Sequence, residues 1–343
     1  MRLLRFLLLP FSLLYGVVTW VRNKLFDFGL KEQFNIPFPS ITVGNLSTGG
    51  TGKTPHVLLL NKWLSKEKKV VVVSRGYGRK TKGLLWADEN STAESIGDEP
   101  LLFLHAEPKP SVIVSEKRRL AIDDLVKKPI ENAVVLLDDA FQHRHVKAGI
   151  NIVLTDFSKP YFNDFMLPTG NLREFRLGIK RADYVIVTKT PVDLSPAKKE
   201  AFSSKIKRKK DTIYFSSIVY SDIETLDKSL LQPEIEYVVL VTGIANPEPL
   251  ETHLKKKYDV HPVVYPDHYQ FKEPDIEDIH GIFGNFAREK TIILTTEKDA
   301  VRLEKFKEIG LLKKYPWCIQ KITVEIDREQ ELKDKLIEYV RKV

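Results

Sequence analysis

The chain has 343 residues, 43% of them hydrophobic, a net charge of +8 and a single cysteine, Cys318. This length and composition allow one large or two ordinary domains with real cores, and they exclude a disulfide scaffold, so we expect a reducing compartment. The positive charge predicts an anionic partner, for which nucleic acid and an acidic membrane are the two usual candidates.

The N-terminal segment 6–21, FLLLPFSLLYGVVTWV, carries no charged residue, and basic residues lie on both sides of it. A helix of this length measures roughly 24 Å, which is short of the ~30 Å hydrocarbon thickness of a bilayer. Tyr15 and Trp20 suit the headgroup boundary, so we expect a membrane-embedded or interfacial anchor helix within residues 1–30. A cleaved signal peptide, for which no small-residue cleavage site follows, and a soluble core helix are the alternatives.

The next informative stretch is GNLSTGGTGKTP at residues 44–55. It follows a short β-branched run and precedes a segment with helix-like apolar content, which is the setting that a phosphate-binding P-loop requires. Ser47 stands where the ordinary pattern has its first glycine, so the loop is a variant, and a plain glycine turn is the alternative. In a P-loop, Lys53 would contact the β- and γ-phosphates of ATP, and the Thr54 hydroxyl would bind Mg²⁺. The residues expected to hold the nucleotide are Ser47, Thr48, Gly49, Gly50, Thr51, Gly52, Lys53 and Thr54.

Downstream runs of β-branched and aliphatic residues predict a parallel sheet that is covered on both faces. These runs lie at residues 70–73, 134–137, 150–154 and 184–187. Spacers of helix length separate them, so the predicted fold class is α/β, with a P-loop NTPase-like, mostly parallel sheet flanked by helices. The second run ends in Asp138 and Asp139, where a P-loop enzyme holds its magnesium, and we favour Asp138 as the closer metal partner. A solvent-exposed acidic strand end is the alternative.

We expect the chain to divide into a P-loop core at residues 31–220 and a smaller α/β lobe at residues 237–343. The stretch between them, residues 221–236, has weak periodicity and is the predicted linker. We expect the C-terminal lobe to close over the cleft of the core, because closure excludes water from a phosphoryl-transfer site.

Two basic runs, at residues 205–210 and 255–257, contain no interleaved aromatic residues. No helix-turn-helix, zinc-finger or RNA-recognition motif accompanies them. We therefore interpret both runs as solvated helix faces and expect no nucleic-acid partner.

The sequence VTKTPVD at residues 187–193 loosely resembles the guanine-specificity element of a P-loop GTPase, but its spacing is two residues too long. A GTPase or partitioning-type ATPase is therefore an alternative from a different class of protein. A non-catalytic, nucleotide-binding membrane scaffold is a third reading.

Six further stretches are rich in functional residue types that no generic nucleotide motif explains. They are SRGYGR at 74–79, GDEP at 97–100, DAFQHR at 139–144, LPTGNLRE at 167–174, PDHY at 266–269 and TEKDA at 296–300. Together with the P-loop and the N-terminal anchor, they make the chain resemble the tetraacyldisaccharide 4'-kinase (lipid A 4'-kinase) family, in order and over nearly the whole chain.

This resemblance implies an enzyme of the bacterial inner membrane whose active site lies at the cytoplasmic face. It would use ATP and Mg²⁺ to phosphorylate the 4'-hydroxyl of a tetraacylated glucosamine disaccharide 1-phosphate, which yields lipid IVA in lipid A (lipopolysaccharide) biosynthesis. A lipid acceptor fits a protein that is anchored on an anionic membrane surface.

The resemblance also implies roles for residues in the matching stretches. Asp98 would act on the acceptor hydroxyl with support from His268, and Lys53 would complete the catalytic set. The residues expected to bind Mg²⁺ are Thr54, Glu99, Asp138 and Asp139. Phosphate or head-group contacts are expected from Arg75, Arg79, Gln142, His143, Arg173 and Glu174. An ordinary structural ion pair is the alternative for each arginine.

Overall fold

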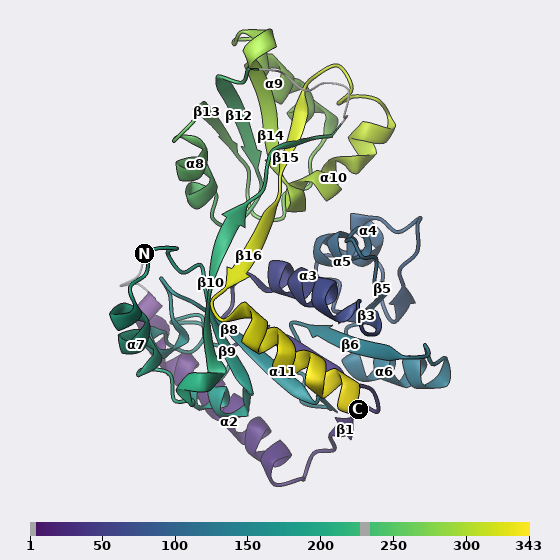
Figure 1. Ribbon diagram of the computed structural model, residues 1–343, viewed down its shortest axis with the longest axis vertical. Helices are drawn as coiled ribbons and strands as arrows, with labels where there is room; N and C mark the ends of the chain where they lie inside the picture. The colour runs from purple at the N-terminus through teal and green to yellow at the C-terminus, as the bar shows by residue number, and fades with distance from the viewer. Residues whose placement is uncertain (1–4, 227–233) are drawn as a thin grey trace. The chain divides into compact units, whose positions relative to one another are not determined.

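The structure is a computed structural model that describes residues 5–226 and 234–343. The chain forms two compact units, one of residues 1–219 and 324–343 and one of residues 220–323. The chain passes into the second unit at the end of β10 and returns to the first unit at β16, as can be followed by colour in Figure 1.

The first unit is built on a nine-stranded sheet with the order β16-β10-β9-β8-β2-β6-β3-β5-β4. Every neighbouring pair from β10 to β5 is parallel, and β4 runs antiparallel to β5. The predicted α/β class with a mostly parallel sheet is therefore confirmed. The strands are β2 (Ser40–Asn45), β3 (Lys69–Ser74), β4 (Leu85–Trp86), β5 (Ser111–Val114), β6 (Ala133–Asp138), β8 (Ile150–Asp156), β9 (Tyr184–Thr188), β10 (Ile213–Tyr220) and β16 (Ile322–Ile326).

Helices connect these strands, as a parallel sheet requires. The α-helices of the first unit are α2 (Leu9–Asp27), α3 (Lys53–Leu64), α4 (Ala93–Ile96), α5 (Asp98–Leu104), α6 (Arg118–Lys127), α7 (Pro196–Ser203) and α11 (Glu329–Lys342). Its short 3₁₀ helices are η1 (Phe6–Leu8), η2 (Tyr161–Asn163), η3 (Arg176–Arg181) and η4 (Lys210–Thr212), and a small separate sheet pairs β1 (Phe34–Asn35) with β7 (Val146–Lys147).

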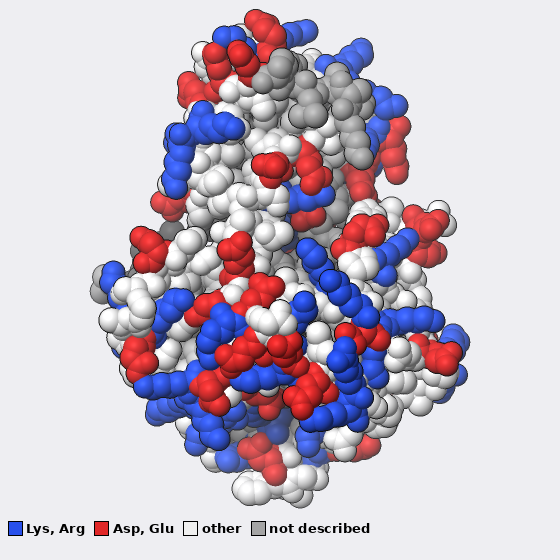
Figure 2. Space-filling view, viewed as in Figure 1, with Lys and Arg blue, Asp and Glu red and all other residues white. Residues whose placement is uncertain are grey.

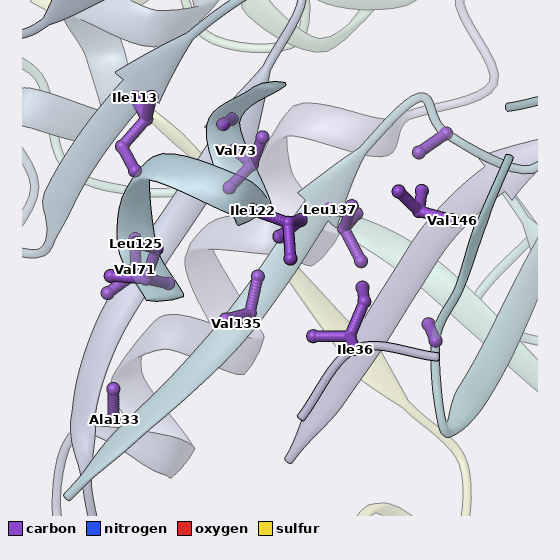
Figure 3. Packing of buried hydrophobic residues seen from close by; sticks show 13 residues of the cluster. Ile36, Val71, Val73, Ile113, Ile122, Leu125, Ala133, Val135, Leu137 and Val146 are labelled. Carbon is purple, nitrogen blue, oxygen red and sulfur yellow. The ribbon is translucent and has the colours of Figure 1, made fainter. Parts of the chain in front are cut away.

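The central strands are buried because apolar side chains cover them on both faces. Figure 3 shows one of these layers, in which Val71 of β3 and Val135 of β6 lie close to Ile122 and Leu125 of α6. All four side chains are fully buried. This packing explains why the strand sequences run without alternation between apolar and polar residues.

The N-terminal helix α2 is the one helix in the described residues that is long and apolar enough to cross a membrane, counted from Phe6 to Asp27. Most of its surface is exposed, but three residues are buried against the rest of the first unit: Ser12, Gly16 and Phe26. The Ser12 hydroxyl donates to Thr169 Oγ1 at 2.8 Å, and Tyr15 donates to the carbonyl of Arg173 at 3.0 Å. The helix is thus docked along one narrow stripe.

The second unit contains a five-stranded sheet with the order β11-β15-β14-β12-β13. Its strands are β11 (Glu224–Thr225), β12 (Tyr237–Thr242), β13 (Asp259–Val264), β14 (Thr291–Thr296) and β15 (Trp317–Gln320). Its helices are α8 (Glu248–Leu254), α9 (Glu273–Phe283), α10 (Glu297–Glu308) and the 3₁₀ helix η5 (Arg288–Lys290). It is a small α/β unit with a core of its own.

The division differs from the predicted one at the C-terminus, because residues 324–343 belong to the first unit and not to the second. Leu332, Leu336 and Val340 of α11 are fully buried. The Tyr339 hydroxyl accepts from the backbone N–H of Ser40 at 3.1 Å, which ties α11 to β2. The predicted linker 221–236 contains β11, which pairs with β15, and its residues 227–233 lie outside the described part of the chain.

Candidate active site

The predicted P-loop lies between β2 and α3, at the carboxyl edge of the parallel sheet. Gly52 caps α3 with φ +82°, a left-handed conformation that a residue with a side chain adopts only at a cost. Asn45 Nδ2 donates to Thr51 Oγ1 at 2.8 Å and fixes the middle of the loop. Lys53 and Thr54 form the first turn of α3, where free backbone N–H groups favour an anion.

A buried histidine, which the sequence analysis missed, holds the end of this loop. The carbonyl of Gly52 can only accept, so His56 Nδ1 carries the proton and donates to it at 2.6 Å. The Ser216 hydroxyl of β10 donates to His56 Nε2 at 3.0 Å. Burial lowers the pKa of His56 to about 4, so the ring is neutral near pH 7. The sequence did offer a signal for His56, which is a polar residue in the first turn of the helix that follows the P-loop.

The other wall of the P-loop is the segment 171–173. Thr48 N–H donates to the carbonyl of Asn171 at 2.7 Å, and Arg173 N–H donates to the carbonyl of Leu46 at 2.8 Å. Ser47 and Leu172 form an isolated antiparallel bridge. The stretch LPTGNLRE is thereby brought against the phosphate loop, although more than 100 residues separate the two in sequence.

Asp138 ends β6 and Asp139 follows it, and the two side chains differ in environment. Asp139 Oδ1 lies 2.8 Å from Arg173 Nη1 and 3.7 Å from Lys53 Nζ. Burial alone would raise the pKa of the Asp139 carboxyl, but the charges of Lys53 and Arg173 bring it below its usual range. Asp139 has φ +47°, which marks the turn that directs it toward Lys53.

Asp138 is 6% exposed and accepts a hydrogen bond from the Ser74 hydroxyl at 2.9 Å. Burial and the neighbouring charge of Asp139 raise the pKa of Asp138 to about 6. The choice of Asp138 as the closer metal partner stays a prediction, and Asp139 is the carboxylate that lies beside Lys53. Carboxylate and hydroxyl oxygens are the ligands that Mg²⁺ prefers, so Thr54, Asp138 and Asp139 fit this ion chemically.

Arg118 is a second functional candidate that the sequence analysis missed. It is 1% exposed, and its guanidinium donates to the carbonyls of Asp138 at 2.9 Å and Ser115 at 2.7 Å. Burial lowers the pKa of Arg118 to about 10, against the opposing charge of Asp138, so the group stays a cation. The available signal was a basic residue at the start of the helix that follows β5, at the same sheet edge as the P-loop.

Gln142 and Glu174 belong to one hydrogen-bond network below the loop. Gln142 Nε2 donates to the carbonyl of Asn45 and to Glu174 Oε1, at 2.9 Å in each case. Glu174 is 2% exposed and also accepts two bonds from Arg181, at 2.7 and 2.9 Å. Asn23 of α2 donates to the same carboxylate at 3.0 Å. This network links α2 to the strand that carries the P-loop.

The remaining residues of the predicted head-group set are distributed around the same edge. Arg75 is exposed at the end of β3. Arg79 has a side chain 2% exposed and donates to Glu116 Oε1 at 2.6 Å, which is the structural ion pair considered as an alternative. Burial and the charge of Arg118 lower the pKa of His143 to about 4, so this ring is neutral near pH 7.

Asp98 and His268 lie in different units. Asp98 is 4% exposed in the first turn of α5, and Glu99 follows it. His268 has φ +60° in the turn after β13, and Lys298 Nζ donates to its Nε2 at 3.1 Å. Arg302 and Asp299 form a fully buried ion pair at 2.8 Å in the same unit. The pairing of Asp98 with His268 stays a prediction.

Comparison with known proteins gives matches over the whole length of the chain. The family described as Tetraacyldisaccharide-1-P 4'-kinase matches residues 4–341. A tetraacyldisaccharide 4'-kinase of Flavobacterium psychrophilum is 43% identical over 99% of this chain and 98% of its own length. The protein of that name from Flavobacterium johnsoniae is 42% identical over 99% and 98% of the two chains.

A solved structure matches as well. The crystal structure of LpxK from Aquifex aeolicus, described as in complex with ATP, has a TM-score of 0.77 and 31% sequence identity, and the match covers 98% of this chain and 99% of that one.

Proposed function

The chain belongs to the tetraacyldisaccharide 4'-kinase family, and from this premise we propose how its own residues carry out that family's reaction. The reaction transfers the γ-phosphate of ATP to the 4'-hydroxyl of a tetraacylated disaccharide 1-phosphate in lipid A biosynthesis. The arrangement of Lys53, Asp139 and Arg173 supports the proposal most directly, since two cations and a carboxylate lie together beside the loop that would bind nucleotide phosphates.

We assign nucleotide binding to the P-loop residues 47–54. Lys53 neutralises charge on the β- and γ-phosphates, and its present contact with Asp139 keeps its ammonium at the mouth of the loop. Arg173 is held through its backbone by Leu46 and through its side chain by Asp139, so it is preorganised to stabilise the transferring phosphoryl group. Arg75 is proposed to contact the acceptor phosphate, and Arg79, Gln142, His143 and Glu174 to shape the site around it.

Magnesium is proposed as the metal, held by Thr54, Asp138 and Asp139, with Glu99 beside them. When bound, this ion would neutralise charge on the phosphates. Among the described residues no group of three His, Cys, Asp or Glu could hold a metal by itself. A magnesium ion that keeps most of its waters and binds phosphate oxygens needs only one or two carboxylates from the protein.

Asp98 is proposed as the base for the acceptor hydroxyl, with His268 orienting its carboxylate, and the second unit is proposed to close over the site. The anchor α2 is proposed to hold the enzyme on the cytoplasmic face of the inner membrane. Lys189, the lysine of the stretch VTKTPVD, forms an ion pair with Asp156 at 2.9 Å, so it is occupied in a structural contact.

The direct test is to incubate the purified protein with labelled ATP, Mg²⁺ and the detergent-dispersed lipid disaccharide 1-phosphate. We expect a doubly phosphorylated lipid. Lys53→Ala should lower kcat by roughly 10²- to 10³-fold, since it removes charge stabilisation in the transition state. Lys62→Ala, which removes an exposed lysine from the other end of α3, is the matched control and should retain activity. Near-normal phosphorylation by Lys53→Ala would contradict the loop assignment.

A further inference from the structure

The apolar surface of α2 continues onto the segment that borders the P-loop, residues 162–181, which we call the bordering segment. Phe165, Phe175 and Leu177 of this segment are 47%, 38% and 57% exposed. Phe6 packs edge-on against Phe165, with ring centroids 5.6 Å apart. At Gly16 a Cβ atom would lie 2.8 Å from the Phe175 ring, so helix and segment are in close contact. Helix α2 and the bordering segment therefore expose one continuous apolar surface.

A basic run lies beside this surface. Lys205, Lys207 and Lys209 are exposed, and no carboxylate in the described ranges lies within ion-pair distance of them. Arg208 Nη1 donates to the carbonyl of Lys180 at 3.0 Å, and Lys205 Nζ lies 5.9 Å from the ring centroid of Phe162. These contacts place the run along the bordering segment, in the loop between α7 and η4. In Figure 2, Lys and Arg side chains gather along the lower left margin, over the region where Figure 1 draws α7 and α2.

We propose that the bordering segment and the basic run form a second membrane contact, which binds the headgroup region of a bilayer that contains anionic lipid. Exposed aromatic and aliphatic residues rimmed by unpaired lysines are the composition of an interfacial binding surface. The proposal rests on the membrane location given under Proposed function. It replaces the interpretation of the run 205–210 as a solvated helix face.

The same segment connects this contact to the phosphate site. Residues 171–173 pair with residues 46–48 of the P-loop, and the Arg173 carbonyl accepts from Tyr15 of α2. Seating the segment on a bilayer therefore brings the P-loop and Arg173 to the level of lipid headgroups. An acceptor sugar that carries acyl chains would reach them without leaving the membrane.

The test measures partition of the full-length protein into phosphatidylcholine vesicles with and without phosphatidylglycerol. Phe165→Ser/Leu177→Ser should weaken binding to both kinds of vesicle by roughly tenfold. Lys205→Gln/Lys207→Gln/Lys209→Gln should weaken binding only to the anionic vesicles, by roughly a hundredfold, since each lysine near such a surface contributes about fivefold.

The second unit offers matched controls for both variants. Val264→Ser/Ile309→Ser removes two side chains of similar exposure there, 58% and 63%, and Lys255→Gln/Lys256→Gln/Lys257→Gln removes three exposed lysines. Both control variants should bind as the wild type does. Affinity for a fluorescent ATP analogue and the thermal unfolding midpoint show whether each variant is folded.

Unchanged vesicle binding by both first-unit variants, or a loss confined to the second-unit variants, would overturn the inference. A wild-type protein that does not bind vesicles, yet phosphorylates the detergent-dispersed lipid, would also overturn it and leave the proposed reaction intact. A wild-type protein that binds vesicles but does not phosphorylate the lipid would instead contradict the proposed function.

Discussion

Asp138 and Asp139 are neighbours in sequence, yet their carboxyl groups have pKa values shifted in opposite directions. Asp139 contacts two cations and stays ionised, whereas Asp138 is buried next to that negative charge. The pair therefore combines a fixed anion with a group that titrates near pH 6. In a phosphate site, such an arrangement lets a bound cation determine the charge of the second carboxylate.

The raised pKa of Asp138 predicts a pH-dependent stability in the metal-free protein. Because the folded state holds this proton up to about pH 6 and the unfolded chain releases it near pH 3.8, the contribution is present below pH 3.8 and is lost as pH rises to about 6. The contribution of Asp138 to the free energy of unfolding should fall by up to about 3 kcal/mol over this range, and it is read as the difference between the wild type and Asp138→Asn. Urea unfolding in EDTA at a series of pH values measures the free energy of unfolding. Asp138→Asn should lack the part of its pH dependence that comes from Asp138. An equal slope in Asp138→Asn would assign the effect to another group.

The proposed Asp98–His268 pair makes a prediction about non-additivity. Asp98→Ala should lower kcat strongly and leave ATP affinity nearly intact, and His268→Ala should do the same less severely. Because paired groups act as a unit, the double variant should be little slower than Asp98→Ala alone. Steady-state kinetics of the four proteins gives the coupling. Additive losses, or a collapse of ATP affinity in Asp98→Ala, would show that the two residues do not act together.

Among the elements, α2 has two faces with different surroundings. Ser12, Gly16 and Phe26 are buried against the first unit, while Leu13 and Val17 are 62% and 54% exposed. Deleting the whole segment would therefore remove hydrogen bonds to the P-loop's neighbours as well as the apolar surface. Substitutions on the exposed face test the proposed anchor and leave the docked face intact.

Leu13→Asp/Val17→Asp should lower the share of the protein in the membrane fraction, because a carboxylate costs about 2.5–3.5 kcal/mol at the centre of a membrane helix, where Leu and Val are favourable. The proposed second contact should hold the remainder. Sedimentation of cell membranes measures this partition. Activity on detergent-dispersed lipid should persist, since these residues do not contact the P-loop. An unchanged share in the membrane fraction would mean that the exposed face of α2 is not the anchor.

Helix α11 completes the first unit, although it is the last element of the chain. Leu336 is fully buried, so Leu336→Ala should lower the free energy of unfolding by about 2–5 kcal/mol. Ile337→Ala, on the partly exposed side of the same helix, is the control and should cost less. Chemical denaturation followed by circular dichroism compares the two, and equal losses would argue against the packing of α11 on the sheet.

For the molecule as a whole, the features that could be predicted from the sequence are those formed by residues close together in the chain. The P-loop, the buried strands and the acidic end of β6 could all be identified because each depends on residues adjacent in sequence. Arg118 and His56 were missed, since only the assembled sheet shows that their polar atoms meet the carbonyls of Asp138 and Gly52. The predicted boundary of the C-terminal lobe was wrong for the same reason. The sequence near residue 324 does not indicate that the chain returns to a sheet that begins at residue 40.

That return has a consequence for synthesis. Tyr339 meets Ser40 across 299 residues of chain, so at ordinary translation rates roughly 15 to 60 s separate the emergence of the two partners from the ribosome. During that interval α2 has already been synthesised, while β10 is an unpaired sheet edge until β16 is made. If α2 anchors the enzyme as proposed, the nascent chain would meet the membrane before its catalytic unit is complete, and chaperone demand should be concentrated on that open edge.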